Sequence, residues 1–108
     1  MPRTITRRAI DATMSEAEWQ KQIVDAAKAG GWLIYHTRDS RRSAKGFPDL
    51  VLVRPPTVIF LELKTDNEKT SKPSPEQELW MGKLRLCRRV FADFARPRHW
   101  PDIEKALR

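Results

Sequence analysis

Two acidic residues and one lysine stand at a spacing that could support hydrolytic chemistry. Asp49 precedes an apolar run, and Glu62 ends a second apolar run, with Lys64 two positions later. Successive side chains of a strand point to opposite faces, so Glu62 and Lys64 share one face. If the two runs pair as a hairpin centred between Pro55 and Pro56, Asp49 lies directly opposite Glu62, with Cβ atoms roughly 5 Å apart.

This set of groups indicates a particular chemistry. Two carboxylates so close repel each other unless a cation lies between them, and hard oxygen ligands suit Mg²⁺ or Mn²⁺. A lysine on the same face can orient an attacking water or neutralise the charge that develops on a phosphoryl group. Together these groups suit hydrolysis of a phosphodiester. A purely structural interpretation stays open, in which Asp49 caps the loop at Pro48 and Glu62 pairs with Lys64.

The charge of the chain points to a partner. With 21 Lys and Arg against 14 Asp and Glu, the formal net charge is +7. Such a surplus favours a polyanion, and nucleic acid is the first candidate, although basic residues also serve solubility alone. The segment 49–72 carries four basic and four acidic residues and lies between two basic flanks. A phosphodiester-processing site would have that distribution, and so would an ordinary core hairpin.

Length and composition exclude several classes. A chain of 108 residues allows one domain. No uninterrupted apolar run approaches the ~18 residues of a membrane span, so we expect no membrane partner. Cys87 is the single cysteine, which excludes an intramolecular disulfide framework and a cysteine-based zinc site. With no secretory signal at the N-terminus, these features predict a cytoplasmic protein.

The elements that must position these residues follow from periodicity and capping signals. Ser15 with Glu18, and Ser74 with Gln77, predict two capped helix starts. The predicted order is helix 15–29, strands 32–36, 49–54 and 57–64, a helix from 75, strand 90–95 and helix 101–107. This α-β-β-β-α-β-α order indicates an α/β fold of the α+β type, with helices packed on a mixed sheet.

Two further expectations concern the chain outside these elements. We expect residues 1–14 to form a basic, flexible tail and residues 15–108 to form the single domain. Between the paired strands, Pro55 and Pro56 cannot supply the positive φ of a tight hairpin turn, so we expect a connection wider than two residues.

Three short motifs resemble those of the PD-(D/E)xK nuclease superfamily, and more narrowly those of the virus-type replication–repair nuclease (VRR-NUC) domain. They are Gly46-Phe47-Pro48-Asp49-Leu50, Glu62-Leu63-Lys64 and Ser74-Pro75-Glu76-Gln77. The resemblance runs from about Ser15 to the final helix. It implies a restriction-endonuclease-like core and a divalent-metal-dependent endonuclease. In small stand-alone members from phages and bacteria, it implies a homodimer that cuts branched DNA such as Holliday junctions, inside a bacterial or phage-infected cell.

The resemblance also implies roles for individual residues. Asp49 and Glu62 would bind the metal, Lys64 would be catalytic, and Gln77 corresponds to the glutamine of the family. A glutamate on the first helix would complete the acidic set as a third metal ligand. We favour Glu16, because Glu18 already has a local explanation as the capping partner of Ser15.

Basic residues in two loops are candidates for DNA binding, with a solvated surface as the alternative. They are Arg38, Arg41, Arg42 and Lys45 before Asp49, and Lys69 and Lys72 after Lys64. His36, at the end of the first strand, is expected to be structural. The arginines at 85, 88 and 89 follow a helix, where cations also offset the helix dipole.

The leading hypothesis is therefore a metal-dependent, structure-selective DNA endonuclease that uses Mg²⁺ or Mn²⁺ and acts as a homodimer. One alternative is a non-catalytic nucleic-acid-binding module that keeps the nuclease fold. Another is a protein–protein adaptor in which the acidic residues are purely structural.

Overall fold

A computed structural model describes residues 7–37 and 42–108 of the chain. Four helices, one 3₁₀ turn and four strands make up these parts. They are α1 (Arg7–Thr13), α2 (Glu16–Ala29), β1 (Leu33–His36), β2 (Leu50–Arg54), β3 (Thr57–Leu63), α3 (Pro75–Leu84), β4 (Val90–Ala95), η1 (Pro97–His99) and α4 (Trp100–Leu107). The order predicted from Ser15 onward is confirmed, with η1 added before the last helix.

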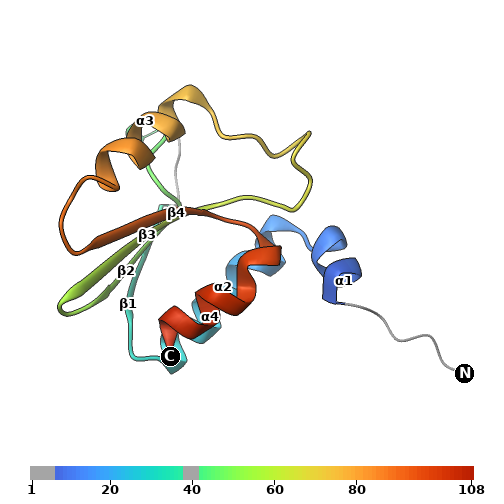
Figure 1. The fold of residues 1–108 in the computed structure, drawn as a ribbon, viewed down its shortest axis with the longest axis horizontal. Helices are drawn as coiled ribbons and strands as arrows, with labels where there is room; N and C mark the ends of the chain where they lie inside the picture. Colours follow the sequence, from blue (N-terminus) through green and yellow to red (C-terminus); the bar gives the residue numbers. More distant parts are fainter. Residues whose placement is uncertain (1–6, 38–41) are drawn as a thin grey trace, which may run out of the picture.

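The four strands form one mixed sheet in the order β1-β2-β3-β4. The first two pairings are antiparallel, and β3 pairs with β4 in parallel through α3. Figure 1 shows α3 on one side of the sheet and α2 with α4 on the other. The α+β fold class is thus confirmed.

Two capping boxes fix where the main helices begin. The hydroxyl of Ser15 accepts from the backbone N–H of Glu18, and the Glu18 carboxylate accepts from the Ser15 N–H. Ser74 and Gln77 make the same reciprocal pair at the start of α3. Each box satisfies backbone donors that the first helical turn leaves without partners. Both predicted starts are confirmed.

The core lies between the sheet and the pair α2 and α4. Trp19, Ile23 and Ala27 of α2 pack on Leu50 and Leu52 of β2, all fully buried. Their spacing of three and four residues places them along one stripe of the helix. The indole of Trp19 donates to the Ala95 carbonyl at 2.7 Å, so the polar atom of this buried ring is also satisfied.

The connection between β2 and β3 differs from the expectation. The register pairs Arg54 with Thr57, so the loop consists of Pro55 and Pro56 alone. The peptide bond between the two prolines is cis. A cis proline at the third position of a four-residue turn reverses the chain without any positive φ.

Part of the N-terminal segment that was expected to be a tail is helical. Residues Arg7–Thr13 form α1, which packs near η1, and Asp11 is buried. Residues 1–6 lie outside the described part of the chain, so the expectation for them stays untested. None of the described helices is long and apolar enough to cross a bilayer.

Candidate active site

The hairpin register places the two predicted carboxylates at the same level of the sheet. Leu50 pairs with Leu61, so Asp49, just before β2, stands opposite Glu62 near the end of β3. One oxygen of Asp49 accepts a hydrogen bond from the backbone N–H of Leu63 at 2.9 Å. This bond ties the start of β2 to the end of β3 and fixes the Asp49 carboxylate beside Glu62.

Glu62 is the buried acid of the site, with 5 % of its surface exposed. One carboxylate oxygen, Oε1, accepts from Nε2 of Gln77 at 2.7 Å. The other, Oε2, is buried and has no hydrogen-bond partner among the described residues. Burial, and then the charge of Asp49, raise the pKa of Glu62 from 4.5 to about 8. An added cation would satisfy the orphaned oxygen and reverse this shift.

Lys64 is also buried, at 8 % exposure, and is held by two acceptors. Its Nζ donates to Oε1 of Gln77 at 2.8 Å and to the Lys72 carbonyl at 3.3 Å. The Gln77 amide thus stands between Glu62 and Lys64, donating to the first and accepting from the second. The described structure shows no direct ion pair of Glu62 with Lys64, the arrangement that the structural interpretation required.

Glu16, the first residue of α2, lies within electrostatic reach of this cluster. Partial burial, and then the charge of Asp49, raise its pKa, while Lys64 acts in the opposite direction. Glu18 is engaged instead in the capping box with Ser15. Of the two candidate acids on this helix, Glu16 is therefore the one whose pKa the charge of Asp49 raises, although its side chain is exposed.

The chemistry of these groups fits a divalent cation between Asp49 and Glu62. No ready-made group of three or more acidic, histidine or cysteine ligands occurs within residues 7–37 and 42–108. Mg²⁺ is commonly held by one or two carboxylates and completes its octahedron with water and substrate oxygens. The unpartnered oxygen of Glu62 and its proximity to Asp49 match that need, with Glu16 at the edge of the site.

The loop before Asp49 is anchored on the first turns of α3. Gly46, at φ +87°, lies so close that an added Cβ would stand 2.4 Å from the carbonyl carbon of Glu76. The ring of Trp80 packs edge-on against Phe47 with centroids 5.1 Å apart, and its N–H donates to the Lys45 carbonyl at 3.2 Å. Lys45 also forms an ion pair with Glu76 at 3.4 Å.

The structure describes four of the six predicted DNA-binding residues. Arg38 and Arg41 lie outside the described residues. Arg42 and Lys45 are exposed on the anchored loop, and Lys69 and Lys72 are exposed after Lys64. The Lys72 carbonyl, rather than its side chain, contacts Lys64. A role in binding DNA stays a prediction for all of these residues.

The sequence interpretation missed Arg96, which organises the loop after Lys64. Arg96 is buried at the end of β4. Its guanidinium donates to the carbonyls of Thr65 at 2.5 Å and Ser71 at 2.9 Å. The only sequence signal was a charged residue directly between an apolar strand and Pro97. That signal does not predict hydrogen bonds to residues about thirty positions earlier in the chain.

The sequence interpretation did not single out Thr37, which contacts the chain at Pro48 and Asp49. The Thr37 hydroxyl donates to the Pro48 carbonyl, and its backbone N–H donates to the Asp49 carbonyl, both at 2.9 Å. His36 is half-buried, with its Nε2 3.4 Å from Nε2 of Gln20 on α2. The two Thr37 bonds fix the backbone that carries Asp49, and the His36 contact is structural, as expected.

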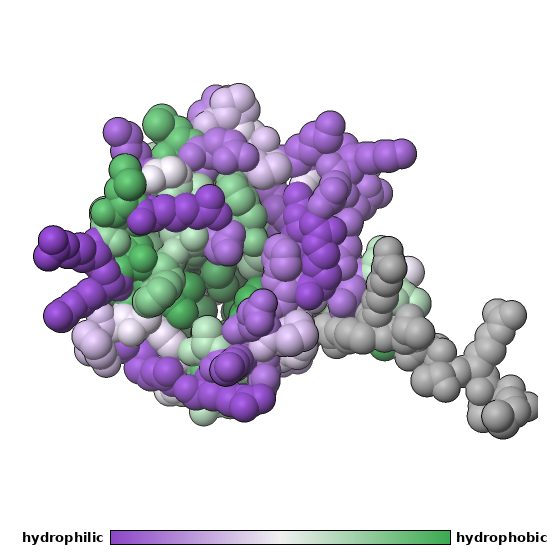
Figure 2. Space-filling model, in the orientation of Figure 1, coloured by the Kyte–Doolittle hydropathy of each residue, from purple (hydrophilic) through white to green (hydrophobic). Residues whose placement is uncertain are grey.

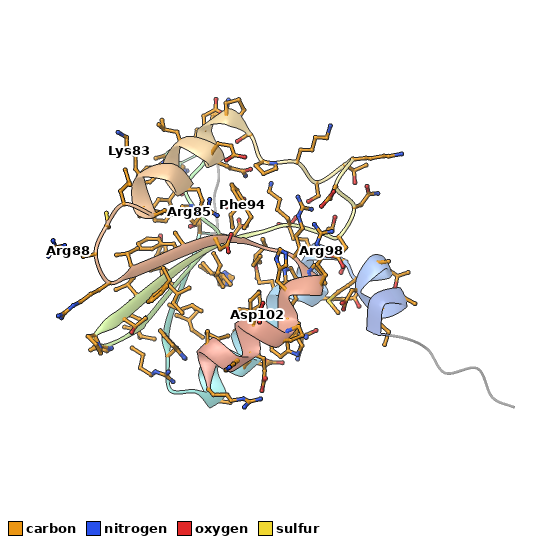
Figure 3. All side chains as sticks on the ribbon, viewed as in Figure 1. Lys83, Arg85, Arg88, Phe94, Arg98 and Asp102 are labelled. Atoms are coloured by element: carbon orange, nitrogen blue, oxygen red, sulfur yellow. The ribbon has the colours of Figure 1, made fainter. Side chains whose placement is uncertain are left out.

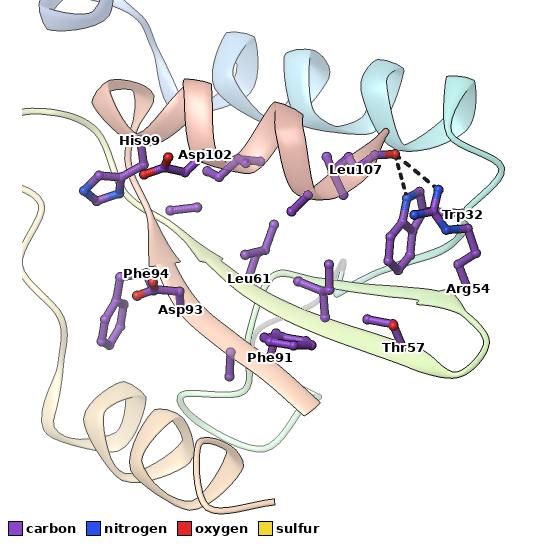
Figure 4. A pocket seen from close by; sticks show the side chains of 15 residues that line it. Trp32, Arg54, Thr57, Leu61, Phe91, Asp93, Phe94, His99, Asp102 and Leu107 are labelled. Atoms are coloured by element: carbon purple, nitrogen blue, oxygen red, sulfur yellow. Dashed lines mark hydrogen bonds between the residues drawn. The ribbon is translucent and has the colours of Figure 1, made fainter. Parts of the chain in front are cut away.

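A separate groove of about 540 Å³ lies on the other side of the sheet, against α4. Figure 2 shows apolar residues grouped on this face of the molecule, between hydrophilic ones. Figure 4 shows Trp32, Leu61, Phe91 and Leu107 along its mostly apolar wall. It contains none of the predicted site residues, so the carboxylate cluster and this groove are distinct features.

The comparisons with known proteins agree with the geometry. The model of the VRR-NUC domain matches residues 5–95. The chain belongs to the VRR-NUC family. A solved structure described as a VRR-NUC domain superposes with a TM-score of 0.62 over 85 % of this chain and 92 % of that chain, at 24 % sequence identity. No curated protein matches the chain.

VRR-NUC domains are generally nucleases, and such nucleases are typically metal-dependent and act on nucleic acid. The family match begins at residue 5 and so includes α1, ahead of the Ser15 at which the sequence resemblance began.

Proposed function

We propose that this VRR-NUC chain is a divalent-metal-dependent DNA endonuclease. The observation that carries the proposal is the cluster of Asp49, Glu62 and Lys64 around the Gln77 amide, with one buried Glu62 oxygen left without a partner. In this proposal Asp49 and Glu62 hold Mg²⁺ or Mn²⁺, and Glu16 adds a third carboxylate at the edge. When bound, the cation would supply Lewis-acid polarisation of the phosphoryl oxygen.

The other residues act on substrate and water. The Lys64 ammonium, held by Gln77 and by the Lys72 carbonyl, keeps one N–H that is free to donate to an attacking water or a phosphoryl oxygen. Gln77 keeps Glu62 and Lys64 apart, so that the lysine charge is available to the substrate. The start of α3 lies beside this cluster, so the positive end of its helix dipole would add positive potential next to a bound phosphate.

The finer part of the proposal concerns substrate and assembly. We expect structure-selective cutting of branched DNA, such as a Holliday junction, by a homodimer in the cytoplasm of a bacterial or phage-infected cell. Symmetric cutting of a four-way junction needs two active sites, which a two-fold dimer supplies.

A cleavage assay tests this proposal. The wild-type chain is incubated with a labelled four-way junction or a linear duplex of matched sequence, in Mg²⁺, in Mn²⁺ or in EDTA. We expect junction cleavage with either metal and none in EDTA, and a dimer in light scattering. Tight DNA binding without turnover in either metal would favour the non-catalytic module. Cutting of both substrates at equal rates would remove structure selectivity alone.

A further inference from the structure

The turn between α3 and β4 carries cations that the active site does not use. From Lys83 to Ala92 the chain has four basic residues and no acidic one. Figure 3 shows Lys83, Arg85 and Arg88 around this end of α3. Arg85 pairs with Asp93 at 2.8 Å. No ion pair joins Arg88 or Arg89 to any residue that the structure describes. We call residues 85–89 the arginine turn.

Arg89 has a backbone conformation that is strained for any residue with a Cβ atom. Its φ is +61°, in the left-handed region that glycine adopts freely and most other residues avoid. A glycine would close the turn with less strain, and the offset of the helix dipole does not require a cation at this position. The Arg89 side chain is exposed, and a use for its charge would explain an arginine at this strained position.

The arginine turn lies at a defined distance from the catalytic cluster. Gln77 and Arg85 are eight residues apart on and directly after α3, which is about 12 Å along the helix axis. By the other route, β4 spans about 20 Å from the turn to Ala95, whose carbonyl accepts from the Lys64 N–H. At 3.4 Å for each nucleotide of a strand, this separation corresponds to about four to six phosphates.

We propose that the arginine turn is a second phosphate-binding site, which holds the backbone of the substrate duplex about four to six nucleotides from the scissile bond. The inference rests on the proposed nuclease function of the site beside Gln77. The guanidinium groups of Arg88 and Arg89 match phosphate geometry and carry no sequence information, so they would hold an arm of the substrate without reading its bases.

Binding measurements with charge-matched variants test this inference. The double variant Arg88→Ala/Arg89→Ala is compared with Lys28→Ala/Lys105→Ala, which removes the same charge from exposed positions on α2 and α4. Kd for a long-armed junction is measured over a range of salt concentrations. Ca²⁺ replaces Mg²⁺ in these measurements, so that binding is measured without cleavage. We expect the arginine variant to bind about tenfold more weakly and its salt slope to fall by about two, since each lost phosphate contact removes about 0.9. The lysine variant should keep the wild-type slope. Equal slopes in the two variants would overturn the inference.

A glycine substitution at Arg89 distinguishes the effect of the charge on DNA binding from its effect on stability. Arg89→Gly relieves the strained φ while it removes one cation, so the variant should melt at a higher temperature and yet bind DNA more weakly. Arg89→Lys should keep most of the affinity. If Arg89→Gly binds DNA as tightly as the wild type, the arginine is not a phosphate contact.

Substrate length separates this inference from the proposed function. On a junction whose arm ends about three nucleotides from the cut, the arginine variant and the wild type should cleave equally, and only longer arms should favour the wild type. Failure of the wild type to cleave any substrate would instead remove the proposed function.

Leu86 in the arginine turn is 82 % exposed, which also suits a contact with another protein. Arginine variants that lose the dimer but keep DNA affinity would assign the turn to a protein interface and overturn the inference.

Discussion

Gln77 donates its side-chain amide to Oε1 of Glu62 at 2.7 Å, and this bond links the first turn of α3 to the end of β3. The same side chain accepts from Lys64 and from the Ser74 N–H. Glu62 is thereby left with one free oxygen, which points to a cation as its remaining partner.

Gln77→Glu tests this bridge without removing the helix cap. A glutamate can still accept from the Ser74 N–H and from Lys64, but it places a negative charge against Glu62 instead of a donor. We expect kcat to fall about 10- to 100-fold, as for other groups that orient a metal ligand. Ser74→Ala is the matched control, because it removes only the hydroxyl of the capping box. It should lower the free energy of unfolding by about 1 kcal/mol and leave kcat within a few-fold. Equal losses of kcat in both variants would mean that Gln77 acts only as a cap.

The raised pKa of Glu62 predicts how stability depends on pH. The carboxyl binds its proton more tightly when folded (pKa about 8) than at its ordinary value of 4.5. Its contribution is therefore present below about pH 4.5 and is lost as the pH rises toward 8. In EDTA the free energy of unfolding should fall by roughly 2–4 kcal/mol between pH 5 and pH 8.5, at 1.36 kcal/mol for each unit of pKa shift. Urea denaturation at several pH values measures this.

Glu62→Gln is the control for that pH dependence, because it removes the one carboxyl that the prediction concerns. The variant should lose most of the decline and be more stable than the wild type at pH 8.5 without metal. Added Mg²⁺ should stabilise the wild type at that pH and leave the variant nearly unchanged. A wild type and a variant with parallel profiles in EDTA would show that Glu62 is not the responsible group.

Gly46 should tolerate no side chain. An added Cβ would stand 2.4 Å from the Glu76 carbonyl carbon, and φ is +87°. Gly31 has a similar φ of +76° but nothing within 4 Å of the added Cβ, so Gly31→Ala isolates the backbone cost. We expect about 1–2 kcal/mol for Gly31→Ala and at least about 3 kcal/mol for Gly46→Ala, with loss of cleavage in the second variant alone. Thermal melting and the cleavage assay measure both, and equal costs would contradict the close contact with α3.

Arg96 should hold the loop after Lys64 in place. Arg96→Met removes the two bonds to the Thr65 and Ser71 carbonyls but keeps much of the buried volume. We expect trypsin to cut after Lys69 at least several-fold faster, because the loop opens locally. Arg98→Ala removes only the exposed ion pair with Glu68 and should change the cutting rate little. Unchanged protection in Arg96→Met would show that the loop is held by other contacts.

Local signals in the sequence were enough to predict the helices and strands from Ser15 onward. They were also enough to predict that Asp49 lies opposite Glu62 in the sheet. The two capping boxes and the symmetry of the hairpin about its prolines depend on residues close in the chain. Contacts between distant segments were not readable, such as Arg96 with Thr65 or Gly46 with Glu76, because many alternative partners satisfy the same composition. The capping role of Gln77 was enough to explain its position. Its hydrogen bonds to both Glu62 and Lys64 were therefore not predicted. Helix α1 lacked capping signals and was taken for a tail.

The most direct test of the central claim is single-turnover cleavage of a four-way junction in Mg²⁺ by the wild type, Asp49→Asn and Lys64→Ala. Melting curves first establish that each variant is folded. We expect each substitution to lower the cleavage rate by at least about 100-fold, since each removes a charge aimed at the transition state. If both folded variants cleave as fast as the wild type, the carboxylate cluster is not the active site.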